Sequence, residues 1–465
     1  MKIQGFYLLP HPPIIIPEVG TGEERKIKNT GNAFREIAKE VQQKAPHTII
    51  LITPHGTMFN DAINLVYEDT LRGSLKQFGV PNVKMEVKIN KSLTNKIFEI
   101  AREENIPAVM STKEFLKDYN ISLSLDHGAM VPLYFINQYY TDYTLVHITY
   151  SPLSVVELYQ FGMEIKRAVE ESNEKTIIIA SGDLSHRLKD EGPYDYSPFG
   201  EKFDNEFLHH LQEGDVMNVF KMDKKTVQNA GECGRRSVLI MLGALDRSAF
   251  KGHLLSYEKT FGVGYGIMRF EITGDEDSRL ETIKNLSYEK KQNQKDPYVK
   301  LARDSLTSYL ETGKFLDKIP SYVTSEMRNT KRGVFVSLKK DGELRGCIGT
   351  IFPATSSIAH EIIRNAVEAG IHDPRFYPVE AHELLDIDFS VDVLTEPEKA
   401  DKSTLDPKEY GVIVRSKGRT GLLLPDLEGI DTIEKQIDIA LKKAGIQPSE
   451  QYDIERFRVI RHREE

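Results

Sequence analysis

The sequence predicts a two-domain α/β protein: a larger first domain with a mostly parallel sheet flanked by helices on both faces, then a smaller α+β domain. Three observations predict this class. Over residues 1–275, short β-branched apolar segments alternate with charged amphipathic ones, which is typical of parallel strands joined by helices. Residues 276–295 are highly charged and almost without clustered apolar residues, as in a linker. Residues 296–465 contain hairpin-like pairs of alternating apolar and polar residues, which indicate a largely antiparallel sheet.

The strands expected in the first domain are short and apolar. The segment TIILIT (48–53) is apolar on both faces, as a central strand buried between two helix layers is. The other expected strands cover residues 3–9, 143–150, 176–180 and 262–272, and the expected helices cover residues 23–44, 91–105, 154–171, 199–211 and 235–245.

The second domain follows the linker with a helix and then a hairpin, whose turn is KDGE (340–343). LDIDFSVDVL (385–394) alternates apolar and polar residues and is expected to be a half-buried strand. The remaining expected strands cover residues 334–339, 344–351, 411–415 and 421–424, and the expected helices cover residues 298–312, 357–370 and 431–444.

Composition narrows the class of protein. Of the 465 residues, 40% are hydrophobic and 28% are charged, so each half can bury a core. A net charge of -9 argues against nucleic-acid binding, since phosphate contacts need a basic face. Two distant cysteines, Cys233 and Cys347, exclude a disulfide framework and indicate a reducing compartment. With no apolar run of about 20 residues and no signal-peptide pattern, we expect a cytoplasmic protein without a membrane partner.

Several histidines fall at one predicted edge of the sheet. His11, His55 and His186 each follow the carboxyl end of an expected strand, where open α/β sheets bind ligands. His127 lies in LDHGAM, just before an expected helix. One histidine in such a place is more often a hydrogen-bonding loop residue than a ligand. Their joint placement, with glycine or proline beside His11, His55 and His127, predicts a metal site instead.

The third ligand is open to two interpretations. Two imidazoles and one carboxylate form the facial triad of non-haem Fe(II) sites, and His11, His55 and Glu232 would supply it. Cys233, the next residue, is the alternative ligand, because a thiolate suits zinc, copper or softer iron chemistry. A lone cysteine is more commonly a small buried hydrophobe.

Asp183 and His186 lie three residues apart after an expected strand. Asp183 is expected either to orient the His186 imidazole or to cap a turn. In the first case His186 would be free to act as a general base, since imidazole titrates near neutral pH.

The motifs of the first domain resemble the class III extradiol ring-cleaving dioxygenases of the LigB type and the related Memo family. The resemblance spans residues 1–275. The segments that carry it are LLPHPP (8–13), ITPHG (52–56), LDHGAMVPL (125–133), SGDLSH (181–186) and GECGRRSVLIMLGAL (231–245).

The resemblance implies roles for individual residues. His11 and His55 would bind Fe(II), with Glu232 as the third ligand, as in the dioxygenases. In Memo-like relatives a cysteine of a CGR motif takes that place, and Cys233 matches it. His186 would be the catalytic acid/base, and the DHG histidine, His127, would line the substrate side.

The implied activity is ring opening of a catechol- or aminophenol-like substrate by dioxygen, with Fe(II) as the expected metal and zinc or copper as alternatives. Two other functions stay open. One is a zinc-dependent hydrolase in which a zinc-bound water attacks and His186 is the base. The other is a non-catalytic, Memo-like metal-binding or adaptor protein.

The second domain resembles the AMMECR family over residues 296–463, chiefly through LRGCIGT (344–350). HDPRF (372–376) and GLLLP (421–425) support it. Fusion of such a domain to a LigB/Memo-like one resembles the AmmeMemoRadiSam system, which implies a radical-SAM protein as partner.

The candidate functional residues of the second domain are Arg345, Cys347 and His372. Beside Arg345, a partly exposed Cys347 would be a reactive thiolate. The plainer interpretation is a buried strand cysteine whose flanking glycines allow close packing. His372 begins HDPR, which also fits a turn in which Asp373 bonds its own backbone.

Overall fold

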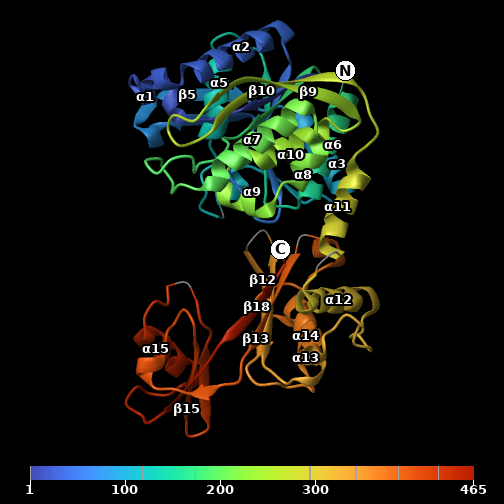
Figure 1. Cartoon of the computed structure of the whole chain (residues 1–465). Helices are drawn as coiled ribbons and strands as arrows, with labels where there is room; N and C mark the ends of the chain where they lie inside the picture. Colours follow the sequence, from blue (N-terminus) through green and yellow to red (C-terminus); the bar gives the residue numbers. More distant parts are fainter. Residues whose placement is uncertain are drawn as a thin grey trace. The chain divides into compact units, whose positions relative to one another are not determined.

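The computed structural model describes residues 2–464 except residues 118, 173, 293–294, 341–342, 386 and 428. Two compact units make up the chain, Met1–Leu286 and Ser287–Glu465, and each is described by itself (Figure 1). In the described part of the chain, no helix combines the length and the apolar character that crossing a membrane requires. The expected KDGE turn lies partly outside the described residues.

Unit 1 is built on an eight-stranded sheet in the order β6-β3-β7-β2-β8-β1-β10-β9. Its centre is parallel, because β7, β2, β8 and β1 run side by side in the same direction. β10 and β9 extend one edge antiparallel, and β3 pairs antiparallel with β7. The strands are β1 (Ile3–Leu9), β2 (Thr48–Thr53), β3 (Ile63–Val66), β6 (Ala108–Ser111), β7 (Thr144–Thr149), β8 (Thr176–Ser181), β9 (Ser248–Glu258) and β10 (Tyr265–Asp275).

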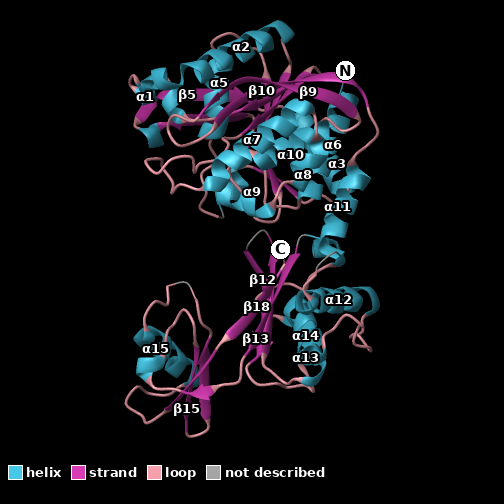
Figure 2. Ribbon diagram, in the orientation of Figure 1, coloured by secondary structure: helices cyan, strands magenta, loops and turns pink. Residues whose placement is uncertain are grey.

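Helices cover both faces of this sheet (Figure 2). Alternate residues of the central strands enter two separate cores: Ile50 and Ile52 of β2 face one, and Ile49 and Leu51 face the other. The first core is closed by α3, α6, α7 and α10, and the second by α2 and α5. The helices of unit 1 are α1 (Pro17–Gly20), α2 (Lys28–Lys44), α3 (Lys91–Glu103), α4 (Lys113–Lys117), α5 (His127–Ile136), α6 (Val155–Ser172), α7 (Pro198–Glu213), α8 (Val216–Lys221), α9 (Lys224–Ala230) and α10 (Arg235–Ala244). The prediction of a mostly parallel sheet between helices is confirmed.

Some elements of unit 1 differ from the expectation. The short strands β3 and β6 and the long edge strand β9 were not predicted. A separate hairpin, β4 (Thr70–Leu75) and β5 (Val80–Lys88), was also missed, and its connecting 3₁₀ turn is Lys76–Phe78. The charged stretch 276–295, which is expected to be a partly helical linker, contains the helix α11 (Leu280–Gln292).

Unit 2 has two four-stranded antiparallel sheets where the pattern predicted one. Their orders are β12-β11-β13-β18 and β14-β17-β15-β16. Helices α12 and α14 share a core with the first sheet, and α15 shares one with the second. The strands are β11 (Val334–Lys340), β12 (Glu343–Thr350), β13 (Ile387–Leu394), β14 (Glu398–Lys399), β15 (Gly411–Ser416), β16 (Arg419–Leu423), β17 (Asp453–Phe457) and β18 (Val459–Arg463). The helices are α12 (Pro297–Thr312), α13 (Ser325–Asn329), α14 (Ile358–Val367), continued by a π-helical turn over Glu368–His372, and α15 (Ile433–Ala444).

Candidate metal centre

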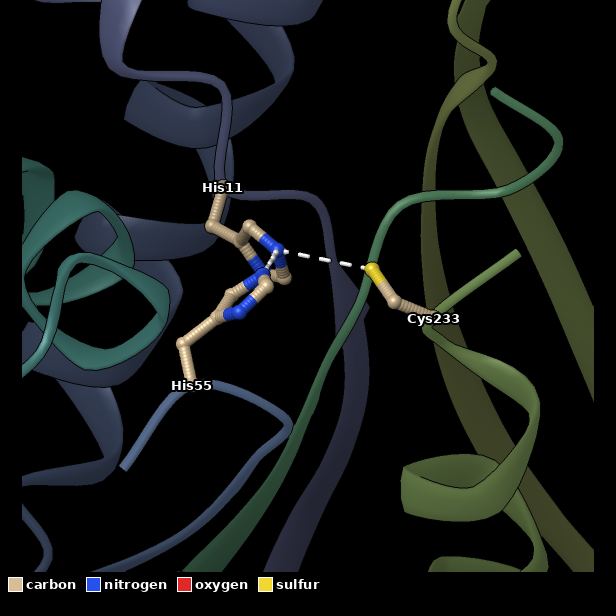
Figure 3. A group of neighbouring side chains, drawn as sticks. All are labelled: His11, His55 and Cys233. Atoms are coloured by element: carbon tan, nitrogen blue, oxygen red, sulfur yellow. Dashed lines mark hydrogen bonds between the residues drawn. The ribbon is translucent and has the colours of Figure 1, made fainter. Parts of the chain in front are cut away.

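Three side chains from distant parts of the sequence converge at the carboxyl edge of the unit 1 sheet. They are His11, His55 and Cys233, whose possible ligand atoms all lie within 4.8 Å of one another (Figure 3). The Nε2 atom of His11 is 3.0 Å from Nε2 of His55 and 3.6 Å from Sγ of Cys233. His11 is thus the centre of the cluster.

His11 follows β1 and is held at both its backbone and its ring. Its N–H donates to Oδ1 of Asp183 at 2.8 Å. Its ring Nδ1 lies 2.9 Å from the Ser181 hydroxyl, which donates its only proton to the carbonyl of Gly128 at 2.5 Å. Ser181 must therefore accept from a protonated Nδ1. This tautomer leaves a lone pair on Nε2, aimed at His55 and Cys233.

His55 follows β2 and packs against another histidine. Its backbone N–H donates to Oγ1 of Thr53 at 3.2 Å. The His127 ring stacks on the His55 ring with centroids 4.2 Å apart and an interplanar angle of 23°. His127 also meets His11 edge to face at 5.4 Å and Phe78 at 5.2 Å. His127 therefore forms a wall of the centre rather than a member of the ligand cluster.

Cys233 reaches the cluster through a backbone contact between two glycines. A Cβ atom added to Gly182, directly after β8, would lie 2.0 Å from Cα of Gly234, the N-cap residue of α10. Only glycine allows this approach. Next to the contact, the Asp183 N–H donates to Sγ of Cys233 at 3.3 Å, and the Tyr150 hydroxyl donates to the Cys233 carbonyl at 3.0 Å. The thiol is thereby held against the end of β8.

The protonation states in this site favour metal binding. Burial lowers the pKa of His11 well below its usual value, with a further contribution from His55. Partial burial of its ring also lowers the pKa of His55. Both imidazoles are thus neutral near pH 7, which is the ligand form. Burial, with the nearby Asp183 and Glu232 carboxylates, raises the pKa of the Cys233 thiol well above its usual value. A bound metal cation would instead lower the pKa of the Cys233 thiol, since a coordinating thiol is deprotonated.

The donor set fits a metal ion. The chain brings together two neutral imidazoles and one thiol, a combination that binds zinc, copper and iron. Glu232, the other candidate for the third ligand, does not join this cluster. Its Oε2 accepts the N–H of Arg235 at 2.6 Å, so the carboxylate caps the first turn of α10.

The candidate proton-transfer groups lie around the cluster. Burial lowers the pKa of His186, whose Nε2 is buried and has no hydrogen-bond partner within the described chain. Its ring stacks on Tyr194 at 5.2 Å. Burial raises the pKa of Asp183 to about 6, but its carboxylate accepts from the His11 backbone rather than orienting His186. Burial and the two neighbouring imidazoles lower the pKa of His127 to about 3.

Sequence reasoning missed a buried pair behind the cluster. Nε2 of His147, in the middle of β7, is 2.7 Å from Oδ2 of Asp126. Asp126 also caps α5, because its Oδ1 accepts the Ala129 N–H at 3.2 Å. The available signal was the position of Asp126 directly before His127, in the DHG motif. A single histidine in an apolar strand gave no comparable signal.

The cysteine motif of unit 2 has a different environment. Arg345 donates to both carboxylate oxygens of Glu383, at 3.1 and 2.9 Å, so its guanidinium is engaged there. Cys347 accepts from the Ser337 hydroxyl at 3.2 Å. The Asp373 carboxylate accepts the N–H groups of Cys347 and Arg375, at 2.9 and 3.1 Å, which is the backbone-bonding turn that the HDPR sequence suggested.

His372 lies beside that turn, and 51% of its side chain is exposed. It pairs with Glu368, with Nδ1 3.3 Å from the carboxylate. The structure therefore places His372 on the surface, in a pair of its own.

A cavity of about 220 Å³ lies elsewhere in unit 1, between α1, β5 and α5. Apolar side chains form much of its lining, among them Leu75, Met85 and Met130. None of the three clustered ligand residues lines it.

Comparisons with known proteins give two family matches. The model described as the catalytic LigB subunit of aromatic ring-opening dioxygenase matches residues 5–268, more than half of the chain. The AMMECR1 model matches residues 299–462.

Relatives share one or both parts. A Clostridium acetobutylicum protein is 62% identical over the whole of both chains. A Thermotoga maritima protein is 48% identical over 36% of this chain and 97% of its own length. The crystal structure of a Pyrococcus horikoshii protein covers 35% of this chain and 88% of that one, at 30% identity and a TM-score of 0.33. Their names state no activity.

Proposed function

This chain belongs to the family of the catalytic LigB subunit of aromatic ring-opening dioxygenase and carries an AMMECR1 domain, and we propose that its unit 1 is a metal-dependent oxidoreductase. Its substrate is a catechol- or aminophenol-like aromatic compound, whose ring it opens with dioxygen. The observation that carries this proposal is the convergence of His11, His55 and Cys233, with the lone pair of His11 Nε2 directed into the cluster. Fe(II) is the proposed metal.

Held by these three residues, Fe(II) would supply open coordination positions for an aromatic diol and dioxygen. Ser181 fixes the His11 ring, so the ligand geometry is set before substrate arrives. His186 is neutral near pH 7 because burial lowers its pKa, and its Nε2 has no protein partner in the described chain. It is therefore available to take a proton from a substrate hydroxyl. The flat face of His127 would border the substrate ring.

A zinc-dependent hydrolase is the second candidate, and one observation favours it. Cys233, not a carboxylate, completes the cluster, and zinc sites that retain an open position include some with thiolate ligands. His186 would then hold the proton of the attacking water. The metal itself separates the two candidates.

The first experiment is metal analysis and X-ray absorption on the full chain, purified without air. We expect iron with nitrogen and sulfur ligands, and loss of the sulfur ligand in Cys233→Ala. Cys347→Ala is the matched control and should keep it, and Glu232→Gln should retain the metal. Unchanged metal content in both His11→Ala and His55→Ala would refute the site. Zinc in place of iron would favour the hydrolase.

The second experiment measures dioxygen consumption by the iron-loaded protein with catechols and aminophenols. Consumption that tracks ring-opened product supports the proposal. His186→Gln should then lower kcat by about 100-fold or more while the iron stays bound. A loaded protein that consumes no dioxygen with any member of the panel would contradict the ring-opening assignment.

A further inference from the structure

The Asp126 carboxylate lies behind the metal centre, and its side chain is only 7% exposed. Oδ2 is 2.7 Å from Nε2 of His147, and Oδ1 accepts the Thr53 hydroxyl at 2.7 Å. Although burial opposes ionisation, the hydrogen bond from His147 keeps the pKa of Asp126 below its usual value. An ionised carboxylate can only accept, so Nε2 of His147 carries a proton.

His147 is an unusual residue for its place. It is 1% exposed in the middle of β7, between apolar neighbours, and its Nδ1 atom is buried without a hydrogen-bond partner among the described residues. An unmet buried polar atom costs stability. An apolar side chain would avoid that cost, so the hydrogen bond to Asp126 is the feature that the histidine adds.

Asp126 is connected to both histidines of the cluster. On one side, Thr53 donates its hydroxyl proton to Asp126 and accepts the backbone N–H of His55. On the other side, the Gly128 carbonyl, in the first turn of the helix that Asp126 caps, accepts the Ser181 hydroxyl. Ser181 in turn accepts from the His11 ring. The first turn of α5 and its cap thus hold, through Ser181 and Thr53, the two segments that carry His11 and His55.

Asp126 also supplies charge without joining the cluster. Its carboxylate is one hydrogen-bonded residue away from His55, through Thr53, and it caps the helix whose first turn holds Ser181 and, through it, His11. A divalent ion bound to one thiolate keeps one positive charge. A buried carboxylate at this place offsets that charge and leaves the coordination positions open.

We propose that Asp126 and His147 are positioning residues of the metal centre: together they orient His11 and His55 and balance the charge of the bound ion. This inference rests on the metal site of the proposed function. It goes beyond that function in assigning a role to two residues that bind no metal.

The test uses Co(II) as the probe and the full chain as the protein. Co(II) affinity is measured by competition with a chromophoric chelator, and the Co(II)–thiolate absorption band reports whether Cys233 is bound. We expect Asp126→Asn and His147→Leu each to weaken Co(II) binding by about 10- to 100-fold and to change the band. His147→Gln should recover part of the affinity, since its amide N–H can donate to Asp126.

Stability is measured in parallel by urea unfolding. Tyr159→Phe is the matched control, because it removes a buried hydrogen bond of unit 1, from Tyr159 to Asp246 at 2.6 Å, which has no link to α5. It should leave Co(II) affinity unchanged. Asp126→Asn keeps an oxygen acceptor for Thr53 and Ala129, so this variant is expected to fold.

The outcomes separate the two proposals. If Asp126→Asn and His147→Leu lower stability but keep the wild-type affinity and band, the pair is structural only and the inference is overturned. If the wild type does not bind Co(II), or binds it equally well in Cys233→Ala, the metal site itself is wrong and the inference falls with it.

Discussion

The two cysteines of the chain occupy opposite kinds of polar surroundings. Around Cys233 in unit 1, the Nε2 atoms of His11 and His55 converge with the sulfur. Around Cys347 in unit 2, neighbouring groups satisfy one another, as Asp373 does with Arg375. Cys233 thus has two further potential metal ligands beside it, whereas the polar groups beside Cys347 are engaged with one another.

The largest effect is expected if the glycine contact beside Cys233 is blocked. Gly182→Val would force the end of β8 away from Gly234, since even a Cβ would lie 2.0 Å from the opposing Cα. We expect the loss of metal binding and a decrease of about 3 kcal/mol in the free energy of unfolding. Metal analysis and urea unfolding check this. Retention of bound metal at the wild-type level would show that the contact does not place the cysteine.

A smaller effect concerns the dependence of stability on pH. Burial raises the pKa of Asp204, in α7 of unit 1, to about 7. In unit 2, hydrogen bonds from Arg375 hold the pKa of Asp373 below its usual value. A carboxyl group whose pKa is raised on folding makes its full contribution to stability below its unfolded pKa of about 4. This contribution is lost as pH rises through about 7. Asp373 acts in the other direction: its contribution is present above about pH 4 and is lost as pH falls.

Asp204→Asn should therefore remove the alkaline loss of stability in unit 1 and leave the acid loss of unit 2 unchanged. Hydrogen exchange, read separately in peptides from each unit between about pH 2 and about pH 8, measures both. An unchanged slope in unit 1 would contradict the prediction. The Asp204 carboxylate accepts from the Ser185 N–H at 2.8 Å, next to His186, so the variant also tests how firmly that loop is held.

The smallest effect is expected for the cysteine of unit 2. Cys347→Ala should change the free energy of unfolding by about 1 kcal/mol or less, since the thiol accepts one hydroxyl and is only partly buried. Thermal unfolding of the full chain measures it. A large loss of stability, or a loss of bound metal, would mean that Cys347 has a role beyond packing.

Much of the fold was predictable because the central strands have a local signature. β2 is apolar on both faces, which only a strand between two layers needs to be. β9 was missed because Lys251, Gly252 and His253 interrupt its apolar pattern, as the solvated edge of a sheet permits. The two sheets of unit 2 could not be separated, since strand pairing depends on contacts distant in sequence. One example is β13 with β18.

For the candidate site, the positions of His11 and His55 after expected strands predicted where these two residues lie. The sequence did not decide which residue is the third member of the cluster. Glu232 and Cys233 are adjacent, and the one that faces inward depends on long-range contacts. Arg235 engages the carboxylate, and the Gly182–Gly234 contact directs the thiol. The pairing of Asp126 with His147 could not be predicted for the same reason, because the two residues come from separate elements.

The unequal exposure of the two histidines has a consequence for the kinetics of metal exchange. His11 is 2% exposed and anchored on both sides, whereas His55 is exposed. We therefore expect a departing ion to lose its bond to His55 first and a chelator to attack from that side. The lifetime of the loaded protein would then depend on how fast the His55 ring swings out, which its stacking on His127 slows.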